Sequence, residues 1–560
     1  MKTTGATLIM RLLERQGITT VAGIPGGANL PLYDALRVSG IRHVLARHEQ
    51  GAGFIAQGMA RATGAAAVCF GTSGPGATNL VTAIADAKLD SIPLIAVTGQ
   101  VPRAMIGTDA FQEIDTYGLT IPITKHNFLV RSPAELCEVI PEAFRIAVSG
   151  RPGPVVVDVP KDVQSETIEL DRLPEPGRAD PPPPVDADEV ARAAELINAA
   201  RRPVFLVGAG VIAAGGSPLL RRVAEKAAVP VAATLLGLGA MPHDHPLFLG
   251  MVGMHAARCT NLLLDECDLL VGLGIRFDDR AIGKAAAFCP RAAIVHVDID
   301  PSELGKIKRP ALGIVADVGE VLRELEPRIA PAHRCAWIAR MASLRAAHPL
   351  AMPGADDPRQ PYGIIRHAAA LAGRDCLVTS DVGQHQMWVA QAYPFDTPRQ
   401  WLTSGGLGTM GFGLPAAIGA ALARPDRTVV CFSGDGSLLM NLQELATAAE
   451  ENVAVKVILL NNAHLGLVRQ QQELFDGGRY HASRFEVTAD FVAIARGFGV
   501  AGVDLGDSAD PVDALKCALS APGPCLINVP IGAAENVYPM VPPGAANREM
   551  IEGGAHVSRC

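Results

Sequence analysis

An aspartate and an asparagine each follow a short apolar run in the last third of the chain, and their oxygens suit a metal ion. Gly434-Asp435-Gly436-Ser437 comes after the run 427–432, and Asn461-Asn462 comes after the run 455–460. Such runs predict buried strands, and open parallel sheets bind ligands at the carboxyl ends of their strands. Carboxylate and amide oxygens are ligands of Mg²⁺, and glycines let a backbone approach a diphosphate closely. The pattern therefore predicts a site for Mg²⁺ and a diphosphate group.

The spacing of these residues decides between that site and two ordinary turns. Each short motif by itself is typical of a plain turn. Twenty-six residues separate Asp435 from Asn462, which is enough for one helix that returns to a neighbouring parallel strand. The paired strands and the double asparagine favour the cofactor site. Glu49, in Arg47-His48-Glu49-Gln50-Gly51, is by itself typical of a solvated carboxylate at a helix start.

Composition narrows the functional class of the chain. The 560 residues are 49% hydrophobic and 19% charged, with a net charge of -8, which argues against a general binder of nucleic acid or of anionic membranes. Eleven cysteines, an odd number without a CxxC pair, indicate free thiols in a reducing compartment. No signal-peptide core and no apolar run of about 18 residues is present, so we expect a cytoplasmic protein without a membrane span.

Two proline-rich breaks divide the chain into three segments. We predict domains at 1–165, 185–345 and 360–545, joined by linkers at 166–184 and 346–359. Each segment alternates apolar runs with amphipathic helix patterns, so the expected fold is α/β with three doubly wound parallel sheets. The runs 155–160 and 525–530 are both preceded by Gly-Pro and end in proline, which hints that the first and third domains are related. The predicted strands are 66–70, 94–97, 154–159, 203–207, 268–272, 293–297, 427–432, 455–460 and 525–529.

Several motifs together resemble those of the acetohydroxyacid synthase (acetolactate synthase) catalytic subunit, a thiamine diphosphate (ThDP) enzyme. Glyoxylate carboligase, a close relative of that family, lacks the glutamate that this chain carries as Glu49. Catabolic acetolactate synthases lack the run 276–280, so the resemblance is to the biosynthetic, FAD-containing type. The motifs are Pro25-Gly26-Gly27-Ala28, Arg47 to Gly51, Thr72 to Asn79, Ile106 to Glu113, Gly150 to Pro154, Arg276-Phe277-Asp278-Asp279-Arg280 and Ser404 to Gly413.

The resemblance implies where ThDP and its metal bind. The three domains would bind the pyrimidine, FAD and the diphosphate, and ThDP would lie across the subunit interface of a homodimer or tetramer. Glu49 would hydrogen-bond the pyrimidine ring, while Asp435, Asn462 and the backbone carbonyl of His464 would hold Mg²⁺. Met410 would bend ThDP, although its spacing alone fits a core methionine equally well. The other implied ThDP contacts are Pro25, Gln384, His385, Gly434, Gly436 and Ser437.

The implied reaction is a decarboxylating condensation of two 2-ketoacids in branched-chain amino-acid biosynthesis. Two pyruvates give 2-acetolactate and CO₂, and pyruvate with 2-ketobutyrate gives 2-aceto-2-hydroxybutyrate. Arg280 would bind the acceptor carboxylate, for which a guanidinium is well shaped; the alternative is a surface arginine paired with Asp278 or Asp279. Gly27 would be catalytic, and Phe111, Gln112 and Lys161 would line the channel, although Lys161 equally fits a solvated loop.

One residue departs from the usual family pattern. Gln471 stands where many members carry a tryptophan that packs on the ethyl group of 2-ketobutyrate and stacks on herbicides. The glutamine-rich run resembles the isozyme I type of enteric bacteria. Because one methylene in an apolar pocket is worth only ~1–3 kcal/mol, we predict weak 2-ketobutyrate preference and low sensitivity to sulfonylurea herbicides.

A flavin site is implied in the central domain. Gly208-Ala209-Gly210 follows the run 203–207 but misses the full GxGxxG pattern, so a tight strand-to-helix turn is the equal alternative. The net reaction involves no redox change, and FAD would therefore be structural. The implied FAD contacts are Arg151, Gly208, Ala209, Gly210, His255, Gly274, Arg276, Asp298 and Asp317.

Two other functional classes remain open from the sequence. A pyruvate oxidase-type oxidoreductase would pass electrons to FAD and consume oxygen, and a catalytically inactive member would bind ThDP without releasing CO₂. The resemblance also implies a small regulatory subunit. The proline-rich segment 537–545 fits either a mobile lid over the site or a plain surface tail.

Overall fold

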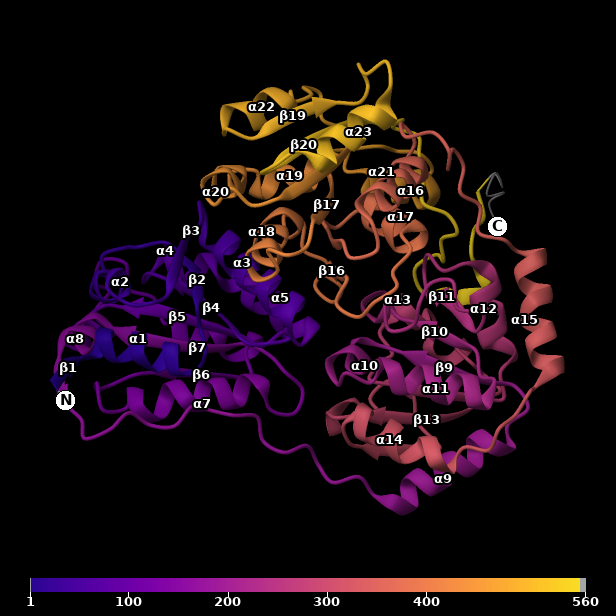
Figure 1. Cartoon of the computed structure of the whole chain (residues 1–560), viewed down its shortest axis with the longest axis horizontal. Helices are drawn as coiled ribbons and strands as arrows, with labels where there is room; N and C mark the ends of the chain where they lie inside the picture. The colour runs from indigo at the N-terminus through magenta and orange to yellow at the C-terminus, as the bar shows by residue number, and fades with distance from the viewer. Residues whose placement is uncertain (1, 554–560) are drawn as a thin grey trace.

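The computed structural model describes residues 2–553, which form three large parallel sheets and one small ribbon. Each large sheet has six strands, and all their pairings in the described chain are parallel. The ribbon pairs β1 (Lys2–Thr4) with β8 (Thr167–Glu169) antiparallel. Figure 1 shows the first and central domains side by side, with the third across the top. The predicted fold class is confirmed.

The first sheet lies between two helical layers. Apolar residues of its strands alternate between the two faces, as the pleat requires: Val68 and Phe70 pack with the layer that contains α1 and α7, and Ala67 and Cys69 with the layer that contains α3 and α5. In sheet order the strands are β3 (Arg42–Leu45), β2 (Thr20–Gly23), β4 (Ala67–Gly71), β5 (Leu94–Gln100), β7 (Val155–Pro160) and β6 (His126–Leu129). The helices are α1 (Gly5–Arg15), α2 (Leu30–Arg37), α3 (Glu49–Thr63), α4 (Pro75–Asn79), α5 (Val81–Asp90), α6 (Thr116–Thr120), α7 (Leu136–Val148) and α8 (Lys161–Ser165).

The third sheet repeats the strand order of the first. Numbered along the chain within each sheet, both orders are 2-1-3-4-6-5, which supports the relation inferred from their matching strand ends. In sheet order the strands are β16 (Trp401–Thr403), β15 (Leu377–Ser380), β17 (Val429–Gly434), β18 (Val455–Asn461), β20 (Cys525–Pro530) and β19 (Ala501–Asp504). The helices are α16 (Pro361–Ala372), α17 (Gln384–Ala392), α18 (Gly413–Ala423), α19 (Asp435–Asn441), α20 (Glu444–Glu450), α21 (Gly466–Phe475), α22 (Phe491–Gly497) and α23 (Pro511–Ser520).

The central sheet has a different order, 3-2-1-4-5-6, which is that of dinucleotide-binding domains. In sheet order its strands are β11 (Phe248–Met251), β10 (Val231–Ala233), β9 (Pro203–Val207), β12 (Leu269–Leu273), β13 (Ala293–Asp298) and β14 (Leu312–Val315). Its helices are α9 (Ala187–Ala199), α10 (Ala209–Ala213), α11 (Ser217–Ala227), α12 (Arg258–Glu266), α13 (Asp279–Ile282), α14 (Val318–Arg328) and α15 (Cys335–Ala347). The three sheets span residues 20–160, 203–315 and 377–530, and the exact domain limits stay a prediction.

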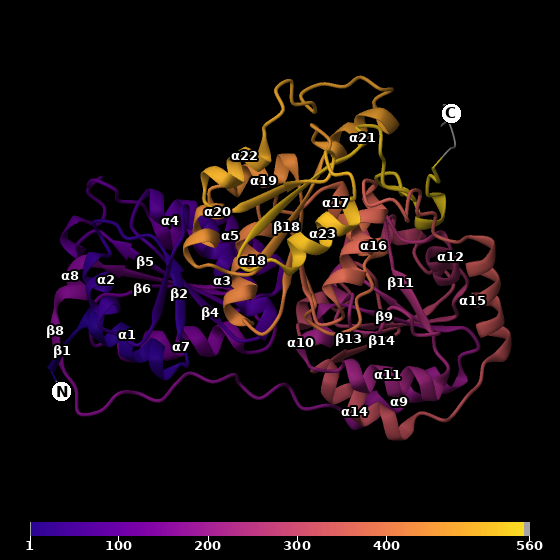
Figure 2. The ribbon, with the colours of Figure 1, turned by 45° about the horizontal axis from the view of Figure 1, so that its top comes forward.

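Helices α3 and α18 join the first and third domains back to back (Figure 2). A side chain at Gly58 of α3 would overlap the carbonyl oxygen of Ala416, and one at Gly419 of α18 would overlap that of Ile55. The contact is reciprocal, and both helices occupy the same place in their domains, between the second and third strands. Apolar residues of both sheets therefore share one core across this joint.

The crossing from Asp435 to Asn462 differs from the prediction of a single helix. It contains two helices, α19 and α20. Helix α19 ends at Asn441, whose side-chain amide donates to the Gly411 carbonyl (2.8 Å). The break turns Glu444 so that its carboxylate accepts the backbone N–H groups of Arg47 (3.0 Å) and His48 (3.1 Å) ahead of α3. All nine predicted strands are present, with ends shifted by at most three residues.

Candidate active site

The carboxyl ends of β15 and β17 form a small cavity at the point where the strand order of the third sheet reverses. Ligands of open α/β sheets bind at such switch points. The cavity has a volume of about 60 Å³. Its lining includes every residue of the third domain for which a ThDP or metal contact was predicted: Gln384, His385, Met410, Gly434, Asp435, Gly436, Ser437, Asn462 and His464.

Asp435 is the first residue of α19, and one of its carboxylate oxygens has no hydrogen-bond partner. Its Oδ1 accepts the Gly436 N–H (2.9 Å), whereas Oδ2 is buried without a hydrogen-bond partner. Burial raises the pKa of this carboxyl to about 6, against the lowering effect of nearby backbone N–H groups. A buried oxygen that lacks a partner costs free energy, and a cation would remove that cost. The site therefore fits a metal ion on the Asp435 side.

Asn462 brings a second oxygen to the same cavity. Its Oδ1 accepts the His464 N–H (3.1 Å), and its Nδ2 donates to Gln384 Oε1 (3.3 Å). The His464 ring folds back, with Nδ1 2.7 Å from the Asn462 carbonyl oxygen. The imidazole is thus engaged with its own loop, and the predicted metal role of His464 needs only its backbone carbonyl.

His385 presents a neutral nitrogen to this cavity. Burial lowers the pKa of its ring to about 3, so the imidazole stays uncharged at neutral pH. Its Nε2 is buried without a partner, and a Cβ at Gly434 would lie 2.8 Å from Nδ1. Glycine at 434 therefore keeps a side chain from colliding with the His385 ring.

The matching edge of the first sheet holds the other predicted residues. Glu49 begins α3 and is only 8% exposed. Its Oε2 accepts from Asn79 Nδ2 (2.9 Å), and Oε1 lies where a Cβ at Gly76 would come within 3.3 Å. The loop of Pro25 and Gly27 follows β2, and a Cβ at Gly27 would meet nothing within 4 Å. These residues surround the switch point between β2 and β4.

The channel residues of the first domain are more open. Gln112 has a positive φ of 60°, and its backbone lies against Gly74. Phe111 is 87% exposed, and Lys161 begins α8 directly after β7. Neither Glu49 nor any of these three residues lines the small cavity of the third domain. The structure thus gathers the predicted residues into separate half-sites on the first and third domains.

A far larger cavity, about 910 Å³, opens at the switch point of the central sheet. Gly208 follows β9 and Gly274 follows β12, and their backbones are so close that a side chain at Gly208 would overlap the Gly274 carbonyl oxygen. Such close backbones leave room for a dinucleotide. The lining contains all nine residues predicted to contact FAD: Arg151, Gly208, Ala209, Gly210, His255, Gly274, Arg276, Asp298 and Asp317.

Several of these nine have partners within the protein. Arg151 pairs with Glu303 (2.7 Å) and Asp300 (3.2 Å). Asp317 caps α14 by accepting two backbone N–H groups, which gives it a structural role as well. Burial raises the pKa of Asp298 to about 6.

Arg280 and Gln471 reach the same cavity from two domains. Arg280 Nε lies 3.8 Å from an Asp279 oxygen, too far for a hydrogen bond, and its side chain is 64% exposed. Gln471, on α21 of the third domain, lines the cavity as well. The predicted acceptor residues therefore border the larger cavity and not the smaller one.

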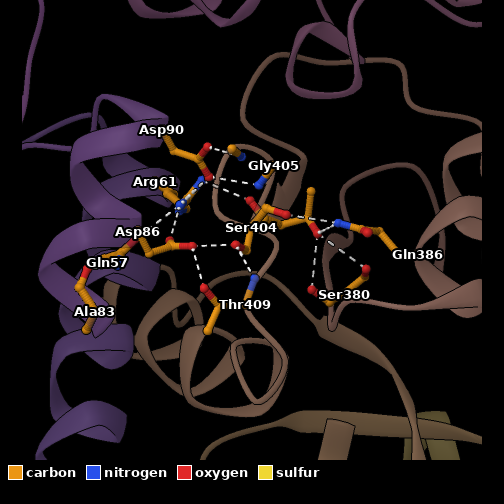
Figure 3. A network of polar contacts seen from close by, with 12 residues as sticks. Gln57, Arg61, Ala83, Asp86, Asp90, Ser380, Gln386, Ser404, Gly405 and Thr409 are labelled. Carbon is orange, nitrogen blue, oxygen red and sulfur yellow. Dashed lines mark hydrogen bonds and ion pairs between the residues drawn. The ribbon is translucent and has the colours of Figure 1, made fainter. Parts of the chain in front are cut away.

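The loop 404–412 separates the two cavities, because Ser404 to Gly408 line the large one and Met410 lines the small one. Figure 3 shows how α5 of the first domain holds this loop. Asp86 accepts from the hydroxyls of Ser404 and Thr409 (3.2 Å), and Asp90 accepts the N–H groups of Gly405 (2.9 Å) and Gly406 (2.7 Å).

A buried arginine holds the two aspartates together. Arg61 Nη2 lies 3.0 Å from Asp86 and 2.8 Å from Asp90, and Nη1 donates to the Thr403 carbonyl (3.0 Å). From the other side, Asp381 Oδ1 accepts the Gly413 N–H (3.0 Å). The sequence motifs did not point to these positioning residues; the spacing of Asp86 and Asp90 on one helical face was the only readable signal.

The C-terminal segment is no plain surface tail. Val537, Met540 and Val541 are buried, and His255 Nδ1 lies 3.0 Å from the Pro539 carbonyl oxygen. Ten cysteines of the described chain are free, as predicted, and Cys560 lies outside the described residues. None of the helices described is both long and apolar enough to cross a membrane.

Three family models match the chain, one for each domain. The N-terminal TPP binding domain of thiamine pyrophosphate enzymes matches residues 3–119, the central domain of these enzymes matches 190–325, and the C-terminal TPP binding domain matches 381–529.

Curated relatives match over nearly the whole chain. The acetolactate synthase isozyme 1 large subunit of Escherichia coli K12 is 59% identical, over 98% of this chain and 97% of that protein. The acetolactate synthase large subunit of Parasynechococcus marenigrum is 47% identical, over 99% and 91%. The probable acetolactate synthase large subunit of Methanocaldococcus jannaschii is 44% identical, over 98% and 95%.

Proposed function

The chain belongs to the acetolactate synthase large-subunit family of thiamine pyrophosphate enzymes, and we propose that its two half-sites bind one ThDP with Mg²⁺ to condense 2-ketoacids. The reaction supplies branched-chain amino-acid biosynthesis: two pyruvates give 2-acetolactate and CO₂. The buried oxygen of Asp435 that lacks a partner, at a switch point beside Asn462, carries the placement of the metal.

In the third domain, Asp435, Asn462 and the His464 carbonyl would hold Mg²⁺. Two buried atoms there lack partners, Asp435 Oδ2 and His385 Nε2. The Asp435 oxygen fits a cation, and the His385 nitrogen would donate to a phosphate oxygen in the tautomer that carries the ring proton on Nε2. ThDP bound there would supply the nucleophilic carbon and the electron sink that a decarboxylating condensation needs. Glycines at 434 and 436 keep the cavity open for the diphosphate.

In the first domain, Glu49 would bind the pyrimidine ring. Its carboxylate is buried and held by Asn79, so it can keep one orientation and exchange a proton with a ring nitrogen. Gly27 leaves open space beside the loop after β2. Gln112 and Lys161 would line the substrate channel, and the exposure of Phe111 suits a residue that a second copy covers.

We propose that a second copy of the chain completes each active site. Glu49 and Asp435 belong to separate half-sites, and large apolar side chains are exposed on both domains: Phe111 (87%) and Ile121 (58%) on the first, Met440 (52%) and Val468 (45%) on the third. Homodimer and tetramer both satisfy this arrangement. The relatives are large subunits, and we propose a small regulatory partner and, from the free thiols, a cytoplasmic location.

FAD would occupy the cavity of about 910 Å³ in the central domain. The strand order, the close approach of Gly208 to Gly274 and the acidic Asp298 at the end of β13 fit a dinucleotide. Because the condensation involves no net redox change, this flavin would have a structural role.

Arg280 would bind the carboxylate of the second substrate, with Gln471 beside it in the same cavity. A polar amide offers no apolar wall for an ethyl group, so we expect weak preference for 2-ketobutyrate over pyruvate. Replacing Gln471→Trp should raise that preference about 5- to 100-fold, equivalent to ~1–3 kcal/mol. Competition between the two acceptors measures it, and strong preference in the parent chain would contradict the proposal.

The test of the main proposal incubates the purified chain with pyruvate, ThDP, Mg²⁺ and FAD while acetolactate and oxygen are quantified together. We expect acetolactate without stoichiometric loss of oxygen. Oxygen loss with acetate or acetyl phosphate would indicate a pyruvate oxidase-type enzyme, which the relatives do not favour. ThDP binding without CO₂ release would indicate an inactive member.

A further inference from the structure

The side chain of Gln470, on α21, is fully buried against the C-terminal segment. Val537 donates its N–H to Gln470 Oε1 (2.9 Å) and accepts at its carbonyl from Gln470 Nε2 (2.8 Å). A backbone N–H can only donate and a carbonyl can only accept. The backbone of Val537 therefore fixes which end of the Gln470 amide is oxygen and which is nitrogen.

Gln470 in turn helps to fix the orientation of the Gln384 side-chain amide in the small cavity. Gln384 Nε2 donates to Gln470 Oε1 (3.0 Å) and to the Glu535 carbonyl (2.8 Å). Both partners are acceptors, so the nitrogen must face them and Oε1 must point the opposite way. There Oε1 accepts from Asn462 Nδ2 (3.3 Å).

Asn462 is thereby oriented by a backbone group of the C-terminal segment. We propose that this amide relay, Val537–Gln470–Gln384–Asn462, turns Asn462 Oδ1 and not Nδ2 toward the metal held by Asp435. Oδ1 accepts one hydrogen bond, from the His464 N–H (3.1 Å), and keeps a lone pair for a cation. A reversed amide would present its donor NH₂ to the metal and repel it.

The space around the relay suits this role. A side chain at Gly466 would overlap Gln384 Oε1 and come within 2.8 Å of Asn462 Nδ2, so only glycine lets the two amides meet. Beside them, Arg469 Nη2 donates to Asn536 Oδ1 (3.2 Å) and fastens the segment that carries Val537. Gln470 is thus a positioning residue, which acts on the metal ligand through Gln384.

The relay matters only if the proposed metal site exists, so the experiment measures both. Mn²⁺ replaces Mg²⁺ as a spectroscopic probe, and its free concentration is read by electron paramagnetic resonance in the full chain with excess ThDP. Replacing Gln470→Leu should weaken Mn²⁺ binding at least tenfold, the low end for partners of metal ligands. Activity should recover at high Mn²⁺, with kcat within about twofold of the parent chain. Gln470→Met serves if Gln470→Leu does not fold.

A matched control separates amide polarity from simple loosening of the segment. Gln391 Nε2 donates to the Tyr538 carbonyl (3.1 Å) and the His255 carbonyl (2.8 Å), and the hydrogen bonds described for Gln391 include no member of the relay. Gln391→Leu should leave Mn²⁺ affinity within about twofold of the parent chain. An equal loss in both variants would overturn the relay and leave only a docking effect.

A double-mutant cycle between Gln470 and Asn462 tests the orientation of the Asn462 amide. Asp at 462 offers oxygen from either end, so in an Asn462→Asp background Gln470→Leu should change Mn²⁺ affinity less than twofold. A tenfold loss in that background would show that Gln470 acts on something other than amide orientation. A parent chain that binds ThDP but no Mn²⁺ would instead refute the metal site on which the relay depends.

Discussion

The first and third domains have the same strand order but hold opposite kinds of chemistry at the same edge. The switch point of the first sheet carries a single carboxylate, Glu49, whose Oε2 has a hydrogen-bond partner in Asn79. The switch point of the third carries Asp435 and His385, each with a buried polar atom that lacks a partner. One domain thus offers a group that can exchange a proton, and the other an incomplete set of ligands. The shared fold places a site, and the residues at the strand ends decide what it binds.

The joint between these domains extends the comparison. Gly58 corresponds to Gly419, and Ile55 corresponds to Ala416. Gly58 faces the carbonyl of Ala416, and Gly419 faces the carbonyl of Ile55. The same offset along the chain relates Glu49 to Met410. At matching positions along the two domains, one domain has the acid that begins α3 and the other has, shortly before α18, the apolar residue proposed to bend the cofactor.

The largest effect is expected when one of the proposed metal ligands of the third domain is removed. Asp435→Ala should abolish ThDP retention in the presence of Mg²⁺, with affinity lowered by at least 100-fold and no measurable turnover, because a metal ligand is lost. Equilibrium dialysis of ThDP measures it. Retained affinity would show that the third domain does not hold the metal through Asp435.

Glu49→Gln should have the opposite pattern. Because the amide cannot exchange a proton with the pyrimidine, kcat should fall about 10²- to 10⁴-fold, while ThDP affinity changes only a few-fold. Steady-state kinetics beside the same dialysis measures both quantities. Equal losses of binding in Asp435→Ala and Glu49→Gln would erase the proposed division of labour.

The pseudo-symmetric joint predicts equal costs on both sides. Gly58→Ala and Gly419→Ala should each lower the free energy of unfolding by about 2–3 kcal/mol, because each added Cβ would overlap a backbone carbonyl. Urea unfolding measures it. Gly497→Ala, which adds a Cβ with nothing within 4 Å, is the control and should be neutral or stabilising. A large cost at only one of the two sites would break the symmetry.

The smallest effect concerns Asp158 and Asn528, which hold the same place in β7 and β20. Burial raises the pKa of Asp158 to about 7, against the hydrogen bonds from Thr98 (2.6 Å) and Gln100 (3.0 Å). Between the unfolded pKa near 4 and the folded value, the folded state binds the extra proton, so stability falls as pH rises.

Asp158→Asn introduces the residue type that the third domain has at this place, and it removes the carboxyl group that binds the extra proton. The variant should therefore gain about 1–3 kcal/mol relative to the parent chain between pH 5 and pH 8, as measured by urea unfolding at both values. A constant difference across this range would mean that Asp158 does not titrate there.

The sequence alone determined the chemistry that lies near strand ends. Apolar runs located the strands, and the residues after two of them pointed to the motif 434–437 and to Asn462. Local order makes this possible, because a parallel strand that ends in a polar residue places it at a known edge of the sheet. The family resemblance supplied Gln384, His385, Met410 and His464 and most of the nine FAD residues that line the large cavity. The second helix after Asp435 was missed for a tertiary reason, since the Asn441 side-chain amide donates to the carbonyl of Gly411 in another loop.

Only the tertiary structure revealed the partners of those residues. Arg61 meets Asp86 and Asp90, and through them the loop 404–412, across more than three hundred residues of chain. Gln470 appeared in the sequence only as part of a glutamine-rich run, yet its buried amide connects Val537 to Asn462 through Gln384. Which end of an amide faces a neighbour depends on donors and acceptors brought together by folding, and no spacing along the chain encodes it.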